Sequence, residues 1–171
     1  MNTNTNTNYS YRKYCVSDAD SIYKLHKKVF KYSKFQHIKM DFLKKLEGYV
    51  IINHKNDNHK IIAYLVYSRN ISQKRNNELW IYLEYIGVHP KYQGSGLGKI
   101  LIDLFTDDLD SNLDKLPSYL DVEDDTNVTE RLIKWYMKSN YVVVKPHMKA
   151  NKEDVFMTRM VRQTKECVWR S

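Results

Sequence analysis

A glycine-rich stretch in the middle of the chain has the residue types of a phosphate-binding loop. It reads Gln93-Gly94-Ser95-Gly96-Leu97-Gly98-Lys99. Glycines let successive backbone N–H groups turn toward one ligand without a Cβ clash, and the first N–H groups of a helix have no partner within the helix. A diphosphate accepts hydrogen bonds from such groups, and the helix dipole and the charge of Lys99 attract it. The stretch therefore predicts an anion site.

The neighbouring residues predict the elements that position this loop. Residues 79–88 are rich in β-branched and aromatic side chains, which is typical of a strand, and His89-Pro90 ends it. Downstream, apolar residues recur at helical spacing, namely Leu97, Ile100, Leu101, Leu104 and Phe105. The glycines therefore lie where a strand turns into the N-terminus of a helix.

The sequence does not match the patterns of two common phosphate-binding loops. A Walker loop needs Gly five residues before Gly98 and Ser or Thr after the Lys, but Gln93 and Ile100 occupy those positions. A dinucleotide fingerprint needs a third Gly or Ala, where this chain has Lys99 or Leu101. An ordinary turn is the remaining structural alternative.

The pattern Gln-x-x-Gly-x-Gly after a strand ending in Val-x-Pro resembles the coenzyme-A pyrophosphate loop of the GNAT superfamily of acyl-CoA-dependent N-acyltransferases. The resemblance implies that acetyl-CoA is the cosubstrate and that residues 93–99 hold its diphosphate. It also implies that the backbone amides of Ile86, Gly87 and Val88 face the pantetheine and thioester. The family's CoA-contacting Asn matches Asn127 with an offset of two residues.

A second segment supports this resemblance. Residues 135–141, Trp-Tyr-Met-Lys-Ser-Asn-Tyr, resemble the family's Leu-Tyr-x-x-x-Gly-Phe signature, which implies that Tyr136 is the general acid. A phenol suits this role because it stays protonated at neutral pH. The alternative is a core tyrosine that shares a helix face with Leu132 and Trp135. Asn140 replaces the usual Gly, and Asn tolerates left-handed backbone geometry.

Two carboxylates are candidates for the base that deprotonates the amine. Glu84 shares a strand face with Trp80, Tyr82 and Ile86, a partly apolar setting that raises a carboxyl pKa. Asp121 is its rival, because Leu120-Asp121-Val122 resembles a Leu-Glu-Val segment that carries the base in some N-terminal amine acetyltransferases. A solvent-facing or ion-paired carboxylate is the alternative for each.

Only the distribution of acidic residues gives an indication of the amine that accepts the acetyl group. The carboxyl end of one predicted strand is acidic, with Asp121, Glu123, Asp124 and Asp125. A cationic amine such as a polyamine, an amino sugar or a lysine side chain suits such a patch. The alternative is that acids commonly precede a helix N-terminus.

The pattern as a whole predicts one α/β domain. We expect strands at 9–16, 49–52, 61–67, 79–88, 118–122, 141–144 and 155–161, and helices near 22–30, 42–46, 97–109 and 128–136. Gly48 suits the C-terminal turn of the second helix. This order resembles the GNAT fold, a mixed, mostly antiparallel sheet flanked by helices. We expect a polar tail at 1–8, an N-acetyltransferase domain at 9–162 and a second tail at 163–171.

Composition narrows the remaining function classes. The chain has 171 residues and a net charge of +8, but its basic residues are dispersed, so we expect no nucleic-acid partner. Cys15 and Cys167 lack metal-type spacing, so no metal site is indicated. Without a leader or an apolar run of about 20 residues, we expect a cytoplasmic protein with no membrane partner.

Two further possibilities stay open at this stage. A homodimer through the carboxyl-terminal strands is compatible with the resemblance. The rival to an acetyl-CoA-dependent N-acetyltransferase acting on a primary amine is a catalytically inactive CoA-binding module that serves as a regulator or scaffold.

Overall fold

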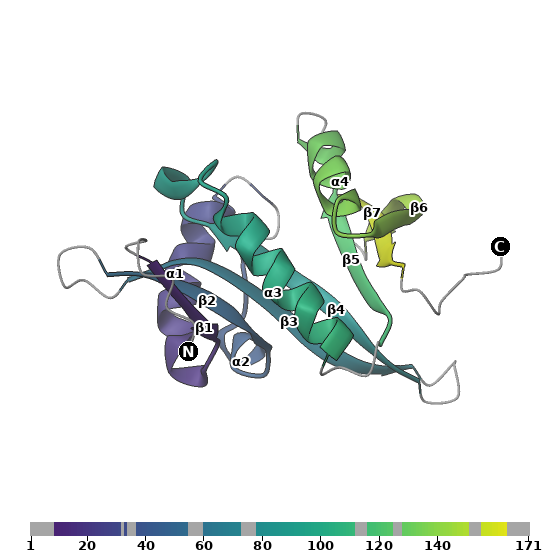
Figure 1. Cartoon of the computed structure of the whole chain (residues 1–171). Coiled ribbons are helices and arrows are strands. Elements are labelled where there is room, and N and C mark those ends of the chain that lie inside the picture. Colours follow the sequence, from purple (N-terminus) through teal and green to yellow (C-terminus); the bar gives the residue numbers. More distant parts are fainter. Residues whose placement is uncertain are drawn as a thin grey trace. The chain divides into compact units, whose positions relative to one another are not determined.

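The structure is a computed structural model, shown in Figure 1. It describes residues 9–31, 33, 37–54, 60–72, 78–111, 116–124, 128–150 and 155–163. The tail expected at 1–8, most of the tail expected at 163–171, and the positions of Asn127, Asp125 and Cys167 lie outside the described residues.

The elements follow the predicted order of strand, two helices, three strands, helix, strand, helix and two strands. They are β1 (Tyr9–Lys13), α1 (Ala19–Val29), α2 (Met40–Leu43), β2 (Glu47–Asn53), β3 (Lys60–Ser72), β4 (Glu78–Val88), α3 (Leu97–Ser111), β5 (Ser118–Glu123), α4 (Thr129–Met137), β6 (Tyr141–Ala150) and β7 (Val155–Arg162). Short 3₁₀ turns lie at Val16–Asp18 and Pro90–Tyr92.

The strands form a mixed sheet in the order β1-β2-β3-β4-β5-β7-β6. β4 and β5 are parallel, and their register joins Ile81–Leu83 to Ser118–Leu120. The described pairings of β1 with β2, β2 with β3, β5 with β7 and β6 with β7 are antiparallel. The predicted fold class, a mostly antiparallel sheet with flanking helices, is confirmed.

The chain divides into two compact units. The first comprises Met1–Ser68 with Glu84–Phe105, and the second comprises Arg69–Leu83 with Thr106–Ser171.

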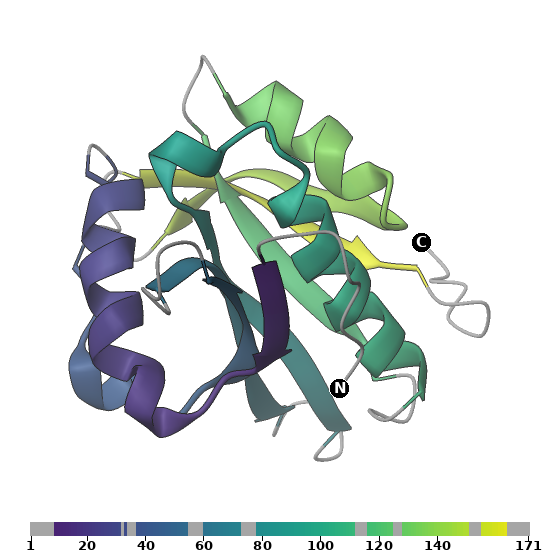
Figure 2. The ribbon, with the colours of Figure 1, turned by 60° about the vertical axis from the view of Figure 1, so that its left-hand side comes forward.

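Alternating side chains of β3 build two layers in the first unit. Tyr64 and Val66 join the apolar cluster of α1, which also includes Ile22 and Leu25. The neighbouring Tyr67 instead packs on Phe105 of α3, with the ring centroids 5.1 Å apart. Because successive strand residues point to opposite faces, α1 and α3 cover opposite sides of these strands, as Figure 2 shows.

A partly buried ion pair joins β1 to the start of α1. Both guanidinium nitrogens of Arg12 donate to Asp18, at 2.6 and 2.8 Å, and the Cys15 backbone N–H donates to the same carboxylate at 3.0 Å. These bonds outweigh the cost of burial and lower the pKa of Asp18. The Asp18 carboxylate therefore ties the start of the helix to the first strand.

The expectation for Gly48 was wrong. Gly48 lies in β2 rather than in the turn after α2, opposite Val66 of β3. A Cβ built there would meet the Leu65 carbonyl oxygen at 2.0 Å. Gly48 is therefore required by the close approach of two strands. The sequence rules for helix ends do not take such a contact into account.

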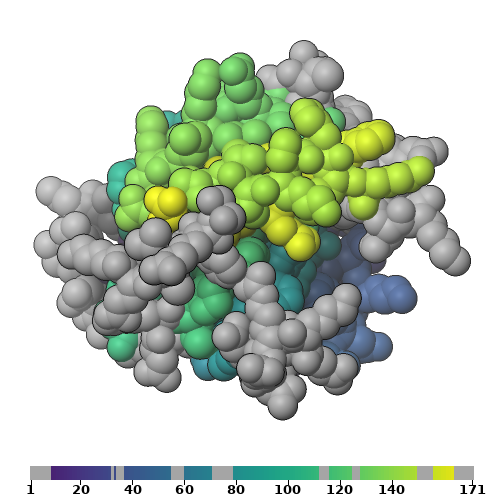
Figure 3. Space-filling view, turned by 90° about the vertical axis from the view of Figure 1, so that its right-hand side faces the viewer, coloured from purple at the N-terminus to yellow at the C-terminus, as the bar shows by residue number. Residues whose placement is uncertain are grey.

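In the second unit, a hydrogen bond of 2.7 Å joins the buried hydroxyls of Ser118 and Tyr141. β6 continues beyond the predicted residue 144 because it pairs with β7 as far as Ala150 and Val155. Two register irregularities near Lys145 interrupt its alternation, which is why the sequence pattern ended early. In Figure 3, yellow-green atoms of β6 lie open on the face shown. Val143 and Val144 of this strand are exposed.

Among the described residues, no helix has the length and apolar character needed to cross a membrane.

Candidate functional site

The glycine-rich stretch forms the predicted bend between a strand and a helix. β4 ends at Val88, the 3₁₀ turn follows, and α3 begins at Leu97. Gly94 and Gly96 have φ angles of +79° and +84°, a region that costs other residues about 1–2 kcal/mol. A Cβ at either position would meet nothing within 4 Å. These glycines are therefore required by the backbone path, and the surface beside them is open.

The backbone amides of this bend are available to a ligand. The helical ladder of α3 begins with the Ile100 N–H donating to the Gly96 carbonyl oxygen at 3.1 Å. Within the described part of the chain, no backbone acceptor is given for the amides of Gly94, Gly96, Leu97, Gly98 and Lys99. Gly94, Ser95 and Gly96 are exposed. The site therefore offers a row of donors at the positive end of a 15-residue helix.

The side chains of the loop brace its backbone. The Gln93 amide donates to the Val88 carbonyl oxygen at 3.1 Å, and the Ser95 hydroxyl donates to the Tyr92 carbonyl oxygen. Lys99 pairs with Asp103 one turn further along α3, and its side chain is 72% exposed. The charge of Lys99 is thus partly compensated by Asp103.

The end of β4 presents its amides in two directions. The His89 N–H donates to the Ile62 carbonyl oxygen of β3 at 2.8 Å. Since successive N–H groups of a strand point to alternate edges, the Gly87 N–H also points toward β3, whereas those of Ile86 and Val88 point to the opposite edge. The geometry favours these two residues over Gly87 as donors to a ligand.

Glu84, the leading base candidate, belongs to the first unit with the loop. It is partly buried, and its Oε1 accepts a hydrogen bond of 2.6 Å from the Ser68 hydroxyl of β3. This short hydroxyl contact orients the carboxylate. An ionised carboxylate has about four lone-pair sites and can accept a proton.

Asp121, the rival base, lies in the second unit and is engaged by an arginine. Arg159 of β7 donates to both of its oxygens, at 2.8 and 2.7 Å, and the Tyr82 hydroxyl donates to Oδ2 at 2.8 Å. Asp121 and Arg159 are opposite each other in the antiparallel register. The sequence analysis missed this arginine because cross-strand partners depend on register. The arrangement favours a structural role for Asp121.

Tyr136 lies in α4 of the second unit and is 6% exposed. Its ring packs edge-on against Trp135 and Tyr141. Burial raises the pKa of Tyr136 well above its ordinary value. Within the described residues, no hydrogen bond to its hydroxyl is recorded. The phenol of Tyr136 therefore keeps its proton at neutral pH.

The turn after α4 confirms the expectation for Asn140. This residue has a φ of +63°, and its N–H donates to the Met137 carbonyl oxygen at 3.2 Å. Asn adopts this region more readily than most residues. The departure from the usual Gly is therefore compatible with the helix-ending turn.

The acidic end of β5 is organised by β6 and β7. The Asp124 carboxylate accepts from Thr158 at 2.8 Å and lies 2.8 Å from Nδ1 of His147. His147 has a φ of +49° within the irregular part of β6. Sequence analysis placed Asp124 in the acidic patch but did not find His147, because the strand irregularity that brings it there has no sequence signal.

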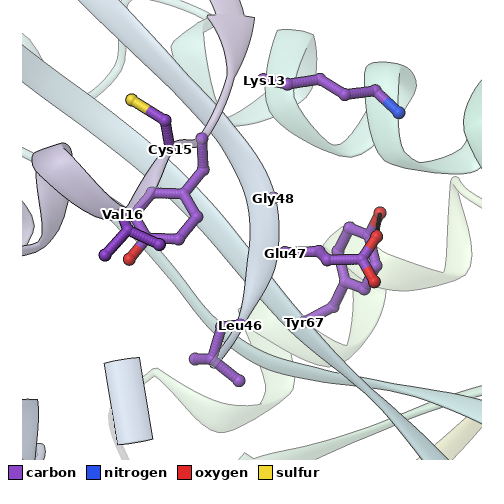
Figure 4. Close-up of a pocket in the computed structure, with 8 residues that line it drawn as sticks. Lys13, Cys15, Val16, Leu46, Glu47, Gly48 and Tyr67 are labelled. Atoms are coloured by element: carbon purple, nitrogen blue, oxygen red, sulfur yellow. Dashed lines mark hydrogen bonds between the residues drawn. The ribbon is translucent and has the colours of Figure 1, made fainter. Parts of the chain in front are cut away.

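A separate hollow of about 230 Å³ lies in the first unit, at the start of β2. Its lining residues are Lys13, Tyr14, Cys15, Val16, Leu46, Glu47, Gly48 and Tyr67. Figure 4 shows Glu47 and Tyr67 side by side, and the Tyr67 hydroxyl donates to Glu47 at 3.3 Å. None of the predicted site residues lines this hollow. Among the described residues, no three His, Cys, Asp or Glu side chains gather as metal ligands.

Comparison with known structures supports the fold. The chain is similar to NAA60 of Arabidopsis thaliana in complex with acetyl-CoA, with a TM-score of 0.70, 12% identity, and coverage of 90% of this chain and 98% of that chain. It is similar to the ribosomal-protein-S18-alanine N-acetyltransferase of Escherichia coli, with a TM-score of 0.66, 14% identity, and coverage of 95% and 99%.

A third similar structure is a spermidine N-acetyltransferase SpeG chimera from Vibrio cholerae and hSSAT, with a TM-score of 0.65, 16% identity, and coverage of 91% of this chain and 95% of that chain. No curated protein matches the sequence. The family model described as "Acetyltransferase (GNAT) family" matches residues 18–141, which include the loop and the Tyr136 helix. The chain belongs to the GNAT acetyltransferase family.

Proposed function

We propose that the protein transfers an acetyl group from acetyl-CoA to a primary amine, by direct attack while both substrates are bound. The observation that carries this proposal is the set of amides of Gly94, Gly96, Leu97, Gly98 and Lys99, for which the described residues supply no backbone acceptor. A diphosphate supplies acceptor oxygens for such a row. The donor set and the open surface beside Gly94 and Gly96 therefore fit the pyrophosphate of acetyl-CoA.

Acetyl-CoA supplies an acetyl group activated as a thioester, and the protein's residues place it and manage protons. The amides from Gly94 to Lys99 bind the diphosphate, and Gln93 braces the loop. The N–H groups of Ile86 and Val88 stabilise negative charge on the thioester carbonyl oxygen as the amine nitrogen bonds to the carbonyl carbon. No covalent enzyme intermediate is needed when both substrates are held together.

Tyr136 and Glu84 supply the two proton transfers. Glu84, or a water that it orders, takes one proton from the ammonium group so that the nitrogen lone pair is free to attack. When the C–S bond breaks, Tyr136 gives its phenolic proton to the thiolate. The second proton, which the nitrogen loses as the amide forms, restores the phenol. A phenol keeps its proton at neutral pH, so Tyr136 has a proton to give. Asp121 is disfavoured as the base because Arg159 occupies both oxygens.

The acceptor in this proposal is a small cationic amine or an amine of a peptide or protein. The similar structures include a ribosomal-protein-S18-alanine N-acetyltransferase and a spermidine N-acetyltransferase chimera. The acidic end of β5, with Asp124 held by Thr158, supports a positively charged acceptor through charge complementarity.

Two measurements on the same preparation test the proposal. Calorimetry measures the binding of acetyl-CoA, and a thiol-release assay screens polyamines, amino sugars, and peptides with free N-termini or lysines. We expect binding together with amine-dependent thiol release. Binding without thiol release across the panel would favour the inactive CoA-binding module, and absence of CoA binding would overturn the assignment of the loop.

A further inference from the structure

A buried histidine and a buried tyrosine form a hydrogen-bonded pair beneath the end of β4. Nδ1 of His26 in α1 lies 2.6 Å from the hydroxyl of Tyr64 in β3. Both residues are 0% exposed. Burial raises the pKa of Tyr64 well above its ordinary value, so its hydroxyl is neutral. A buried polar pair of this kind must stay bonded, because an unsatisfied partner costs about 1–3 kcal/mol.

The tyrosine ring lies directly against Gly87. The His89 N–H donates to the Ile62 carbonyl oxygen, and counting two residues along each antiparallel strand puts Tyr64 opposite Gly87. A Cβ built on Gly87 would lie 2.6 Å from Cε1 and 2.9 Å from Cζ of the Tyr64 ring. The ring therefore occupies the space that any other side chain at position 87 would need.

Two further aromatic groups hold the histidine in place. Phe30 stacks on His26 with the ring centroids 4.6 Å apart. The rings of Tyr85 and His26 form a T-shaped pair with the centroids 4.7 Å apart. Tyr85 lies two residues before Gly87 on the same strand, so the cluster contacts β4 at both positions. The Tyr64 ring is fixed at its hydroxyl by His26 and at its face by the backbone of β4.

We propose that His26 and Tyr64 are positioning residues that set the direction of the Ile86 and Val88 amides. This inference rests on the proposed function, in which those amides stabilise the thioester oxygen. The two amides flank Gly87, so a shift of the Gly87 backbone moves both of them. Such donors must be held within about 0.5 Å of the productive geometry, and a full-sized ring pinned by a short hydrogen bond provides that constraint.

The experiment compares three variants of the full chain by steady-state kinetics with acetyl-CoA and by thermal unfolding. Tyr64→Phe removes only the hydroxyl and its bond to His26. Tyr67→Phe is the matched control, because Tyr67 is a second buried tyrosine of β3 whose hydroxyl bonds to Glu47 on the other face of the sheet. The double variant His26→Leu/Tyr64→Phe removes both polar partners, which restores stability when a buried hydrogen bond is only structural.

We expect Tyr64→Phe to lower kcat about tenfold with an unchanged KM for acetyl-CoA, since a contribution made only in the transition state leaves KM unaffected. Tyr67→Phe should keep kcat within about twofold, because its lost bond lies away from Gly87. The double variant should regain the unfolding temperature of the wild type but not its kcat. The ring at position 64 is then no longer held by a hydrogen bond to residue 26.

Two results would overturn the inference while leaving the proposed function intact. One is a kcat for Tyr64→Phe equal to that of Tyr67→Phe, and the other is recovery of kcat together with stability in the double variant. Either would show that the pair only fills the core. A wild-type protein that neither binds acetyl-CoA nor releases thiol would instead overturn the proposed function itself.

Discussion

Arg159 holds Asp121 through two hydrogen bonds, from Nε to Oδ1 at 2.8 Å and from Nη2 to Oδ2 at 2.7 Å. The Asp121 side chain is 10% exposed and that of Arg159 is 40% exposed. The pair joins β5 to β7. Arg159 binds both oxygens of Asp121, the second candidate for the base in the sequence analysis.

Asp121→Asn should therefore weaken the fold more than the reaction. We expect a loss of about 1 kcal/mol, because half-exposed ion pairs are screened by solvent. The kcat should stay within about threefold if Glu84 is the base. Urea unfolding and thiol-release kinetics check these outcomes together. A stable variant that has lost all activity would return Asp121 to the mechanism.

Glu84→Gln should weaken the reaction more than the fold. Removal of a general base lowers kcat by about 10²–10⁴-fold, while the amide side chain still accepts a hydrogen bond from Ser68 and the fold is retained. Glu47→Gln is the matched control, since Glu47 also accepts from a hydroxyl of β3. Comparable kcat values for the two variants would remove Glu84 from the mechanism.

Tyr136→Phe should lower kcat about 10²-fold, since the thiolate loses its proton donor. Its stability should change little, because no hydrogen bond to its hydroxyl is recorded within the described residues. Tyr141→Phe is the control and should cost about 1 kcal/mol through its lost bond to Ser118, without loss of kcat. Full activity of Tyr136→Phe would exclude it as the acid.

Gly96→Ala should weaken acetyl-CoA binding about tenfold, because a Cβ at a φ of +84° strains the loop by about 1–2 kcal/mol. Calorimetry measures the affinity. Gly48→Ala gives the contrast: its Cβ would collide with the Leu65 carbonyl oxygen, so it should lower the unfolding temperature without changing the affinity of the folded protein. Unchanged acetyl-CoA affinity in Gly96→Ala would contradict the loop assignment.

The protein should lose stability in alkali. Burial raises the pKa of Tyr136 and Tyr141 above the ordinary value of 10.0. Between that value and the folded-state pKa, the unfolded chain has lost phenolic protons that the folded chain retains, so stability falls as pH rises. Urea midpoints should be level up to about pH 9 and decline above about pH 10. The decline should be shallower in Tyr136→Phe, and an equal slope would contradict this origin.

The sequence by itself determined the order of the elements and the chemistry of the loop. Both depend on neighbours in the chain: apolar periodicity sets strands and helices, and Gly94 and Gly96 permit positive φ angles. His26 was not singled out in the sequence, although it lies four residues from both Ile22 and Phe30 and so shares a helix face with them.

Only the tertiary structure decided which polar groups pair. The partner of Asp121 is 38 residues away in β7, and that of His26 is 38 residues away in β3. The sequence also did not reveal why residues 48 and 87 are glycines. The Leu65 carbonyl oxygen lies against Gly48, and the Tyr64 ring lies against Gly87. Strand register brings these atoms together, and register is fixed by packing across the whole sheet rather than by local residue pattern.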